Sequence, residues 1–235
     1  MSNLFSDADL IRPPRELRPG AVWVPGWLNL EQQSWLVARF SEWTQGPVPA
    51  RSPLVGGHPM SVKSVHLGWY WRPYQYSREA VDGNGNKVLD VPDWMVRLGQ
   101  QAIAEAQRHS PTLSSLPASA VDYRPDAILG NYYDEQAHMG MHQDAEERSL
   151  APVVSLSIGD SCRFRFGNSQ NRNKPYEDIS LASGDMFVFG GPARLAFHGV
   201  QKIIPASAPE GCGINRGRIN ITMRVTGLTD ATSGQ

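Results

Sequence analysis

The feature that most constrains the fold is the spacing of apolar residues, which changes to a period of two from about residue 121. Apolar residues alternate with serines over residues 153–159, and Phe187 and Phe189 follow a turn at Ser183-Gly184-Asp185. Short alternating segments between turn residues are typical of strands in a β-sandwich or barrel. The second half of the chain therefore predicts a β-sheet core.

The first 120 residues follow a different pattern and contain all seven tryptophans. Asn29 precedes apolar residues at helical spacing up to Trp43, which predicts an amphipathic helix capped by the Asn29 side chain. A second helix is expected to begin at Pro92. This part of the chain therefore predicts helices joined by loops rich in glycine and proline.

Composition narrows the class of protein. With 235 residues, of which 40% are hydrophobic, the chain is long enough for one structural domain with a real core. Its apolar runs are shorter than the roughly 18 residues of a membrane span, so we expect a soluble cytoplasmic protein without a membrane partner. The two cysteines, Cys162 and Cys212, are expected to be reduced. The net charge of −1 makes no case by itself for nucleic acid binding.

The segment 218–224 is the most informative of the expected strands. On an extended chain its apolar residues project to one side and its polar residues to the other. The polar side carries Arg218, Asn220, Thr222 and Arg224. Two guanidinium groups beside an amide are suited to binding a small dicarboxylate.

A possible metal site lies between these segments. His142 and Asp144 are two positions apart, so on an extended chain both side chains project to one side. His198 follows later, after a predicted strand. Two histidines and one carboxylate form the facial triad of Fe(II) oxygenases, which leaves coordination positions open. Zinc accepts the same ligands, and the cationic strand is what favours iron.

Each of these signals is weak when taken alone. A His-x-Asp pair occurs by chance on many protein surfaces. Two arginines on one strand are equally compatible with a solvated face. The ordered combination of His-x-Asp, a later histidine and Arg-x-Asn-x-x-x-Arg is far rarer than its parts, and we therefore predict a metal centre beside a cationic strand.

These motifs resemble those of the AlkB-like Fe(II)- and 2-oxoglutarate-dependent dioxygenases, which oxidatively dealkylate nucleic acid bases. The likeness extends over roughly residues 60–227 and includes the segments His66-Leu-Gly-Trp69, Asn131-Tyr-Tyr133, Phe164-Arg-Phe-Gly167, Phe189-Gly-Gly191 and Arg194. It implies an α+β fold, with a double-stranded β-helix (jelly-roll) core, N-terminal helices and an aromatic substrate-recognition lid. It also implies three parts of the chain: the N-terminal helices and the nucleotide-recognition lid over residues 1–120, the catalytic core over 121–227 and a flexible tail over 228–235.

The resemblance also implies a role for each motif residue. Iron would be held by His142, Asp144 and His198, and the cosubstrate 2-oxoglutarate by Asn131, Tyr133, Arg218, Asn220 and Arg224. Spacing does not decide which arginine meets which carboxylate, although the family favours Arg218 for the distal one, with Arg224 nearer the metal. O₂ is the remaining reactant.

The stretch 66–77 is dense in aromatic residues and is the expected substrate-recognition element. From composition alone, a platform for an unstacked base and a hairpin packed on the core are equally good interpretations. The resemblance implies a base pocket lined by Trp69 with Tyr74 or Tyr76, while Trp71 is expected to pack. Glu146 is expected to accept a hydrogen bond from a base amine, which suits 1-methyladenine or 3-methylcytosine.

The expected function is oxidative demethylation of N-alkylated bases in DNA or RNA, with release of aldehyde, succinate and CO₂ by a monomeric enzyme. Two alternatives stay open at this point. One is a 2-oxoglutarate oxygenase that hydroxylates a protein or a small molecule. The other is a jelly-roll module that binds without catalysis.

Overall fold

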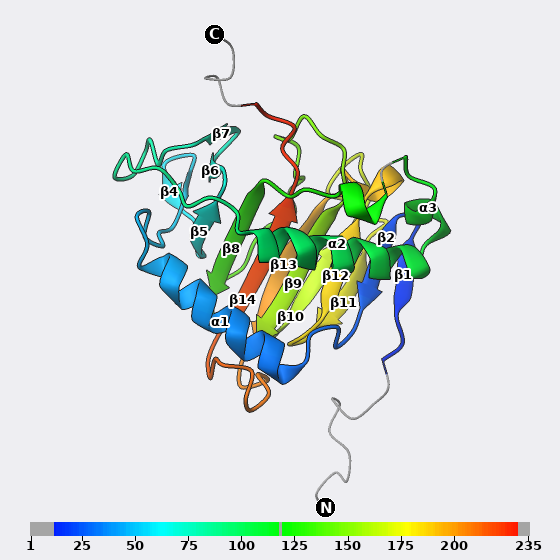
Figure 1. Ribbon diagram of the computed structural model, residues 1–235. Coiled ribbons are helices and arrows are strands. Elements are labelled where there is room, and N and C mark those ends of the chain that lie inside the picture. The colour runs from blue at the N-terminus through cyan, green and yellow to red at the C-terminus, as the bar shows by residue number, and fades with distance from the viewer. Residues whose placement is uncertain (1–11, 118, 230–235) are drawn as a thin grey trace, which may run out of the picture.

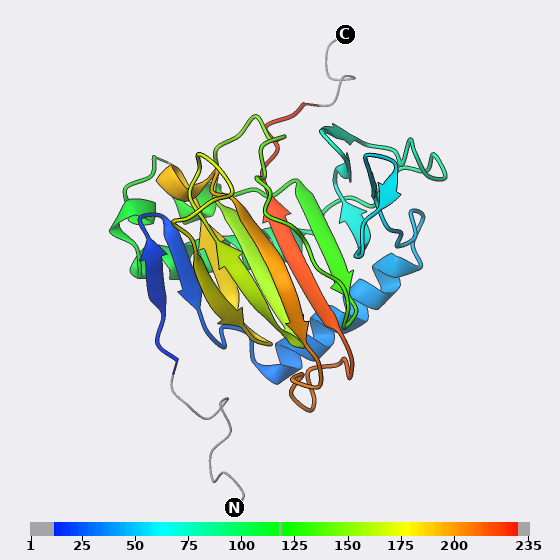
Figure 2. The same ribbon diagram turned by 180° about the vertical axis from the view of Figure 1, so that it is seen from behind.

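The computed structural model describes residues 12–117 and 119–229. Its centre consists of two β-sheets, and helices cover the outer face of the larger one (Figure 1). Figure 2 shows the smaller sheet on the opposite side of the molecule from those helices. This arrangement confirms the predicted α+β fold with a jelly-roll core.

All neighbouring strands in the two main sheets are antiparallel. The larger sheet has the order β1 (Arg15–Arg18), β2 (Ala21–Val24), β12 (Met186–Phe189), β9 (Val153–Gly159), β14 (Arg218–Arg224), β8 (Ala127–Tyr133) and β5 (Lys63–Leu67). The smaller sheet has the order β11 (Glu177–Leu181), β10 (Ser161–Phe166) and β13 (His198–Ile204). Two short hairpins are formed by β3 (Leu54–Val55) with β4 (His58–Pro59), and by β6 (Tyr70–Arg72) with β7 (Gln75–Ser77).

The first 120 residues contribute to the larger sheet as well as to the helices. Strands β1 and β2 form one edge of that sheet, and β5 forms the other. The sheet therefore extends across the expected division at residue 121. Of the expected tail, residues 230–235 lie outside the described part of the chain.

Helix α1 (Leu30–Thr44) begins at the predicted cap. The Asn29 side chain accepts a hydrogen bond from the backbone N–H of Gln32 at 2.8 Å, and the Gln32 side chain accepts one from Asn29 at 2.9 Å. This reciprocal pair is a capping box. Gly130 of β8 allows the helix to pack closely, because a Cβ there would lie 2.9 Å from the Phe40 ring.

Helix α2 (Asp93–Arg108) also begins where the sequence predicted, and α3 (Pro111–Ser114) is a single short turn after it. Met95, Ala102 and Ala106 of α2 are buried against the larger sheet, as their helical spacing requires. Within residues 12–117 and 119–229, no helix combines the length and the apolar character needed to cross a membrane.

Strand alternation divides the buried side chains between two cores. On β14, Ile219 and Ile221 pack in the core that also contains residues of α1 and α2. Phe164 of β10 and Phe187 of β12 pack in the other core, between the sheets, with ring centroids 5.2 Å apart. The polar side of β14 faces this second region, so the predicted alternation of β14 is confirmed.

A buried carboxylate at the turn before β12 ties the N-terminal strands to the sheet. Asp185 is 0% exposed and accepts hydrogen bonds from both Nη atoms of Arg12 and from Nε1 of Trp23, at 2.8–2.9 Å. Backbone N–H groups of Gly26 and Ala182 add two more at 2.9 Å. Saturation by these donors offsets the cost of burying the charge.

We expect Asp185→Ala to lower the free energy of unfolding by about 3 kcal/mol, because it leaves the Arg12 guanidinium and the Trp23 N–H without their acceptor. Urea denaturation followed by tryptophan fluorescence measures the change. The matched control is Asp178→Ala, which breaks an exposed bidentate pair with Arg165 and is expected to cost less than about 1 kcal/mol. Equal losses in the two variants would contradict this role for Asp185.

Candidate active site

The three predicted metal ligands converge at one end of the space between the sheets. His142, Asp144 and His198 each offer one ligand atom, and these three atoms lie within 4.8 Å of one another. His142 Nε2 is 3.6 Å from Asp144 Oδ1, and His198 Nε2 is 3.8 Å from Asp144 Oδ2. This spacing allows all three groups to bind a single cation placed between them.

Backbone pairing sets the two imidazoles side by side. His142 and His198 exchange N–H···O hydrogen bonds of 2.9 Å in both directions, and their ring centroids are 4.5 Å apart. In each ring Nδ1 lies close to a backbone carbonyl, at 3.0 Å from Gly140 O and 2.9 Å from Ala196 O. A proton on Nδ1 leaves the Nε2 lone pair available to a metal.

The Asp144 carboxylate has one oxygen committed and one free. It is 3% exposed, and Oδ1 accepts a hydrogen bond of 2.7 Å from Arg224 Nη2. Oδ2 has no hydrogen-bond partner among the described residues. Burial would raise the pKa of this carboxyl, but Arg224 and the two imidazoles outweigh burial and lower the pKa to about 2. Burial, helped by His142, lowers the pKa of His198 to about 4. Asp144 and His198 are therefore deprotonated at neutral pH, which suits a divalent cation.

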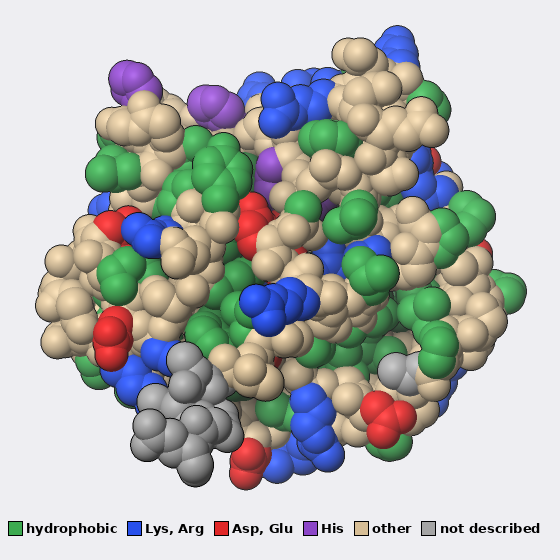
Figure 3. Space-filling model, turned by 90° about the horizontal axis from the view of Figure 1, so that it is seen from above, with side chains coloured by type: hydrophobic (Ala, Val, Ile, Leu, Met, Phe, Trp, Pro, Cys, Tyr) green, Lys and Arg blue, Asp and Glu red, His purple; other side chains and the backbone are tan. Residues whose placement is uncertain are grey.

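A cavity of about 980 Å³ adjoins these ligands. Its walls come from both sheets, from the segment 138–146 and from the β6–β7 hairpin. Figure 3 looks down on this end of the molecule, where histidine and acidic side chains lie among apolar ones. The volume is sufficient for a small dicarboxylate together with part of a larger substrate.

Arg218 lies in this cavity as a buried cation. It is 1% exposed; Nη2 donates to Ser157 Oγ at 2.9 Å, Nη1 donates to the Ile219 carbonyl at 3.3 Å, and Nε has no partner. Among residues 12–117 and 119–229, no carboxylate forms an ion pair with it. Because a buried charge is costly without a counter-charge, the site favours an anion at Arg218.

The other predicted cosubstrate residues line the same cavity. The β8–β14 register places Asn131 opposite Asn220 and Tyr133 opposite Arg218. Arg224 is at the metal end of the strand, where its guanidinium is already paired with Asp144. Of the two arginines, Arg218 is therefore the one that lacks a carboxylate partner.

The structure separates the four predicted substrate residues into two groups. Tyr74 and Glu146 line the cavity; Tyr74 is 83% exposed, and burial raises the pKa of Glu146. Trp69 and Tyr76 are instead buried together beside Ala127, outside the described cavity lining.

Trp71 packs against this buried cluster, as expected, but it also lines the cavity, which Trp69 does not. The reason is the turn at Gly68, whose φ is +74° and whose Cβ, if present, would lie 1.9 Å from the Asp126 carbonyl oxygen. This close approach holds Trp69 against the body of the protein, where the Arg78 guanidinium covers its ring at 4.0 Å.

Glu147 is a residue of the site that sequence reasoning missed. Its side chain is 0% exposed and is paired with Arg194 at 2.9 Å and with Arg224 at 3.2 Å, while the Tyr76 hydroxyl donates to it. In the sequence it is one of two adjacent acids. Because the segment after Asp144 is an irregular loop and not a strand, alternation does not indicate which acid points inward.

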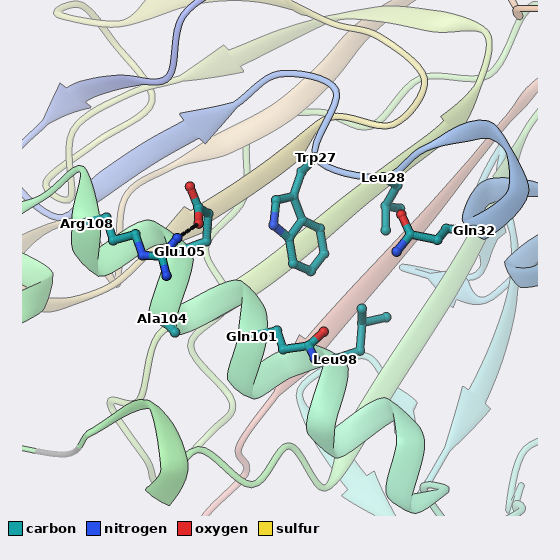
Figure 4. A pocket seen from close by; sticks show the side chains of 8 residues that line it. All are labelled: Trp27, Leu28, Gln32, Leu98, Gln101, Ala104, Glu105 and Arg108. Carbon is teal, nitrogen blue, oxygen red and sulfur yellow. Dashed lines mark hydrogen bonds and ion pairs between the residues drawn. The ribbon is translucent and has the colours of Figure 1, made fainter.

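A second, smaller pocket of about 300 Å³ lies on the helical face, between the start of α1 and the middle of α2. Trp27 and Leu98 provide apolar surface there, and Glu105 and Arg108 form an ion pair of 2.9 Å at its edge (Figure 4). With a single carboxylate and no histidine in its lining, this pocket lacks the ligand set found in the larger cavity.

Comparisons with known proteins agree with this geometry. Residues 20–224 match the family model of the 2OG-Fe(II) oxygenase superfamily. An alpha-ketoglutarate-dependent dioxygenase AlkB homolog of Caulobacter vibrioides is 35% identical over 225 residues, which are 92% of this chain and 91% of the relative. The DNA N(6)-methyladenine demethylase ALKBH1D of Arabidopsis thaliana is 33% identical over 88% of this chain, which spans about half (50%) of that longer protein.

The fold has a counterpart among solved structures. The structure of OsALKBH1 superimposes with a TM-score of 0.79 at 30% sequence identity, and the match covers 90% of this chain and 100% of that one. The resemblance predicted from the sequence is thereby confirmed: this chain belongs to the 2OG-Fe(II) oxygenase superfamily and, within it, to the AlkB-like proteins.

Proposed function

We propose that this chain is an Fe(II)- and 2-oxoglutarate-dependent dioxygenase that oxidatively demethylates N-alkylated bases in DNA or RNA. The observation that carries the proposal is the pairing of two features in one cavity. At one end, His142, Asp144 and His198 present free donor atoms to a common point. At the other, Arg218 is a buried cation that lacks a carboxylate partner among the described residues.

The residues present fit ferrous iron. Two imidazole nitrogens and the orphaned Oδ2 of Asp144 are the donor set of non-haem Fe(II) oxygenases. When bound, iron with 2-oxoglutarate and O₂ supplies the oxidation of an N-methyl carbon, which leaves as formaldehyde, while the cosubstrate is converted to succinate and CO₂. The role of the protein is to hold the reactants in place and to limit access of water.

Arg218 is proposed to bind one carboxylate of 2-oxoglutarate through its guanidinium. Asn131, Tyr133 and Asn220 offer amide and phenol groups along the same wall. Arg224 is proposed to act at the opposite end, where it neutralises Asp144 and lies near the metal-bound end of the cosubstrate. This assignment follows from charge, because Arg224 is already paired with Asp144, whereas Arg218 has no carboxylate partner among the described residues.

The alkylated base is proposed to enter from the open side of the cavity, between the β6–β7 hairpin and the loop after Asp144. Trp71 and Tyr74 provide aromatic surface there for stacking. Glu146 provides an acceptor for an exocyclic amine, which suits 1-methyladenine or 3-methylcytosine. Trp69 and Tyr76, which the family resemblance implicates, would support this wall from behind.

The nucleic acid and the assembly are further parts of the proposal. The Arabidopsis relative acts on N(6)-methyladenine in DNA, and by analogy DNA is the first substrate to test, with RNA beside it. All the residues invoked come from one chain. We therefore propose that a monomer is sufficient for activity, and we keep the expectation of a cytoplasmic location.

The decisive experiment is incubation with methylated oligonucleotides, as DNA and as RNA, in the presence of Fe(II), 2-oxoglutarate and ascorbate. Formaldehyde in proportion to succinate is the expected result, with the unmethylated strand of the same sequence as the control. Succinate without formaldehyde across several methylated bases would favour an oxygenase of proteins or small molecules. Failure to consume 2-oxoglutarate at all would favour a binding module.

We expect Asp144→Ala to reduce formaldehyde release by at least about 100-fold, because the variant lacks the anionic ligand and removes one of the two carboxylates paired with Arg224. The control is Asp178→Ala, which removes an exposed acid outside the cavity and is expected to keep full activity. Formaldehyde release by Asp144→Ala at the wild-type rate would refute the assignment of this ligand.

Arg218→Ala is expected to raise the KM for 2-oxoglutarate by about 30-fold or more, since removal of one partner of a buried charge pair costs roughly 2–5 kcal/mol. The KM for the oligonucleotide is expected to stay near its wild-type value. Steady-state kinetics with each substrate varied in turn measures both constants. A change in the oligonucleotide KM alone would indicate that Arg218 binds the nucleic acid and not 2-oxoglutarate.

Trp71→Ala is expected to raise the KM for the methylated oligonucleotide about tenfold, because a stacked base contributes roughly 1–3 kcal/mol. Turnover of 2-oxoglutarate without nucleic acid is expected to persist in this variant. Trp69→Ala is the comparison. Since Trp69 is 7% exposed, its loss is expected to lower the free energy of unfolding and to leave the KM for the oligonucleotide nearer its wild-type value than Trp71→Ala does. The opposite pattern would assign base stacking to Trp69.

A further inference from the structure

Glu147 carries a buried carboxylate that the proposed chemistry does not use. Its oxygens accept hydrogen bonds from Arg194 Nη2 at 2.9 Å, from Arg224 Nη1 at 3.2 Å and from the Tyr76 hydroxyl. Because an anion with a fully buried side chain is stable only when donors saturate it, these three groups fix its position.

Arg224 connects Glu147 to the metal centre. Its Nη2 donates to Asp144 Oδ1 at 2.7 Å, while its Nη1 donates to Glu147 and to the Tyr76 hydroxyl at 3.1 Å. Arg194 adds a second connection, since its Nη1 donates to the Asp144 backbone carbonyl at 2.7 Å. One buried ionic network therefore holds both the carboxylate and the backbone of Asp144.

Tyr76 connects the same network to the cavity wall. It lies on β7, directly opposite Trp71 in the β6–β7 register. Trp71 and Tyr74 of this hairpin line the cavity, Trp71 also packs against the buried cluster that contains Tyr76, and the Tyr76 hydroxyl enters the network. The chain of contacts thus runs from the aromatic wall through Tyr76, Glu147 and Arg224 to a metal ligand.

We propose that Glu147 is a positioning residue that couples the recognition hairpin, residues 70–77, to Asp144; the proposal rests on the metal centre of the proposed function. A cation bound at the centre holds the Asp144 carboxylate, which restricts Arg224; Arg224 in turn restricts the Tyr76 hydroxyl, both through Glu147 and by its own hydrogen bond to that hydroxyl. Because coupling between two sites is reciprocal, an ordered hairpin also favours the bound metal. Substrate engagement and metal retention are then linked.

Hydrogen exchange of peptides covering the hairpin, with and without Mn²⁺, tests this coupling without turnover. In the wild type, Mn²⁺ is expected to slow exchange at residues 70–77 by about fivefold or more. Tyr76→Phe is expected to lose this slowing and, because the coupling is reciprocal, to bind Mn²⁺ about fivefold more weakly. Glu147→Gln keeps the direct bond between Arg224 and the Tyr76 hydroxyl, so it is expected to lose part of the slowing and to bind Mn²⁺ about tenfold more weakly. Electron paramagnetic resonance of free Mn²⁺ measures binding.

The control variant is Tyr176→Phe, which removes a hydroxyl outside the network and is expected to behave as the wild type. Equal slowing in the wild type and in Tyr76→Phe would overturn the coupling, as would Mn²⁺ binding by the wild type without any slowing. Absence of Mn²⁺ binding by the wild type would instead count against the metal centre and so against the proposed function itself. If Glu147→Gln does not fold, Tyr76→Phe decides the question, because it removes a single oxygen atom.

Discussion

The position of β14 in the middle of the larger sheet determines which side chains meet in the cavity. It is hydrogen-bonded on both sides, to β8 and to β9, so its register cannot slip without moving apolar side chains out of the helix-covered core. Ile219, Ile221 and Met223 are held in that core, and the alternate residues are consequently forced into the cavity. The hydrophobic effect on one face of the strand thus orients two guanidinium groups on the other.

Of the two arginines that β14 places in the cavity, Arg218 has no carboxylate partner among the described residues. Asp144 and Glu147 are balanced by Arg224 and Arg194 through direct ion pairs. Arg218, on the same strand as Arg224, is bonded only to neutral groups. Because unpaired buried charges reduce stability, a fold that retains one has a cost that ligand binding offsets. This imbalance supports the proposal that Arg218 binds one carboxylate of the cosubstrate, a choice between the two arginines that spacing along the strand left open.

The sequence was sufficient for the parts of the protein that depend on regular alternation or on local capping. The start of α1 at Asn29 and the two faces of β14 follow from spacing within a single element, and His142 and Asp144 converge as predicted although they lie outside the helices and strands. Irregular segments were predicted less well. Glu147 was missed because the loop after Asp144 has no period. Trp71 packs as predicted, but its place in the cavity wall was missed, because the tight turn at Gly68 is not visible in the residue types that follow it.

The same contrast explains how recognition and chemistry are combined in one chain. His198 and Arg218 are placed by sheet register, which tolerates little movement, and His142 is held by its backbone pair with His198, whereas Trp71 and Tyr74 lie on a two-stranded hairpin outside both sheets. A two-stranded hairpin is at best marginally stable by itself. Its order must therefore come from contacts with the rest of the protein. The Tyr76 hydroxyl donates a hydrogen bond to the buried Glu147 carboxylate, which also accepts one from Arg224, the residue paired with Asp144. A hairpin anchored in this way can adapt to a substrate while the distance between its anchor and the metal centre stays short.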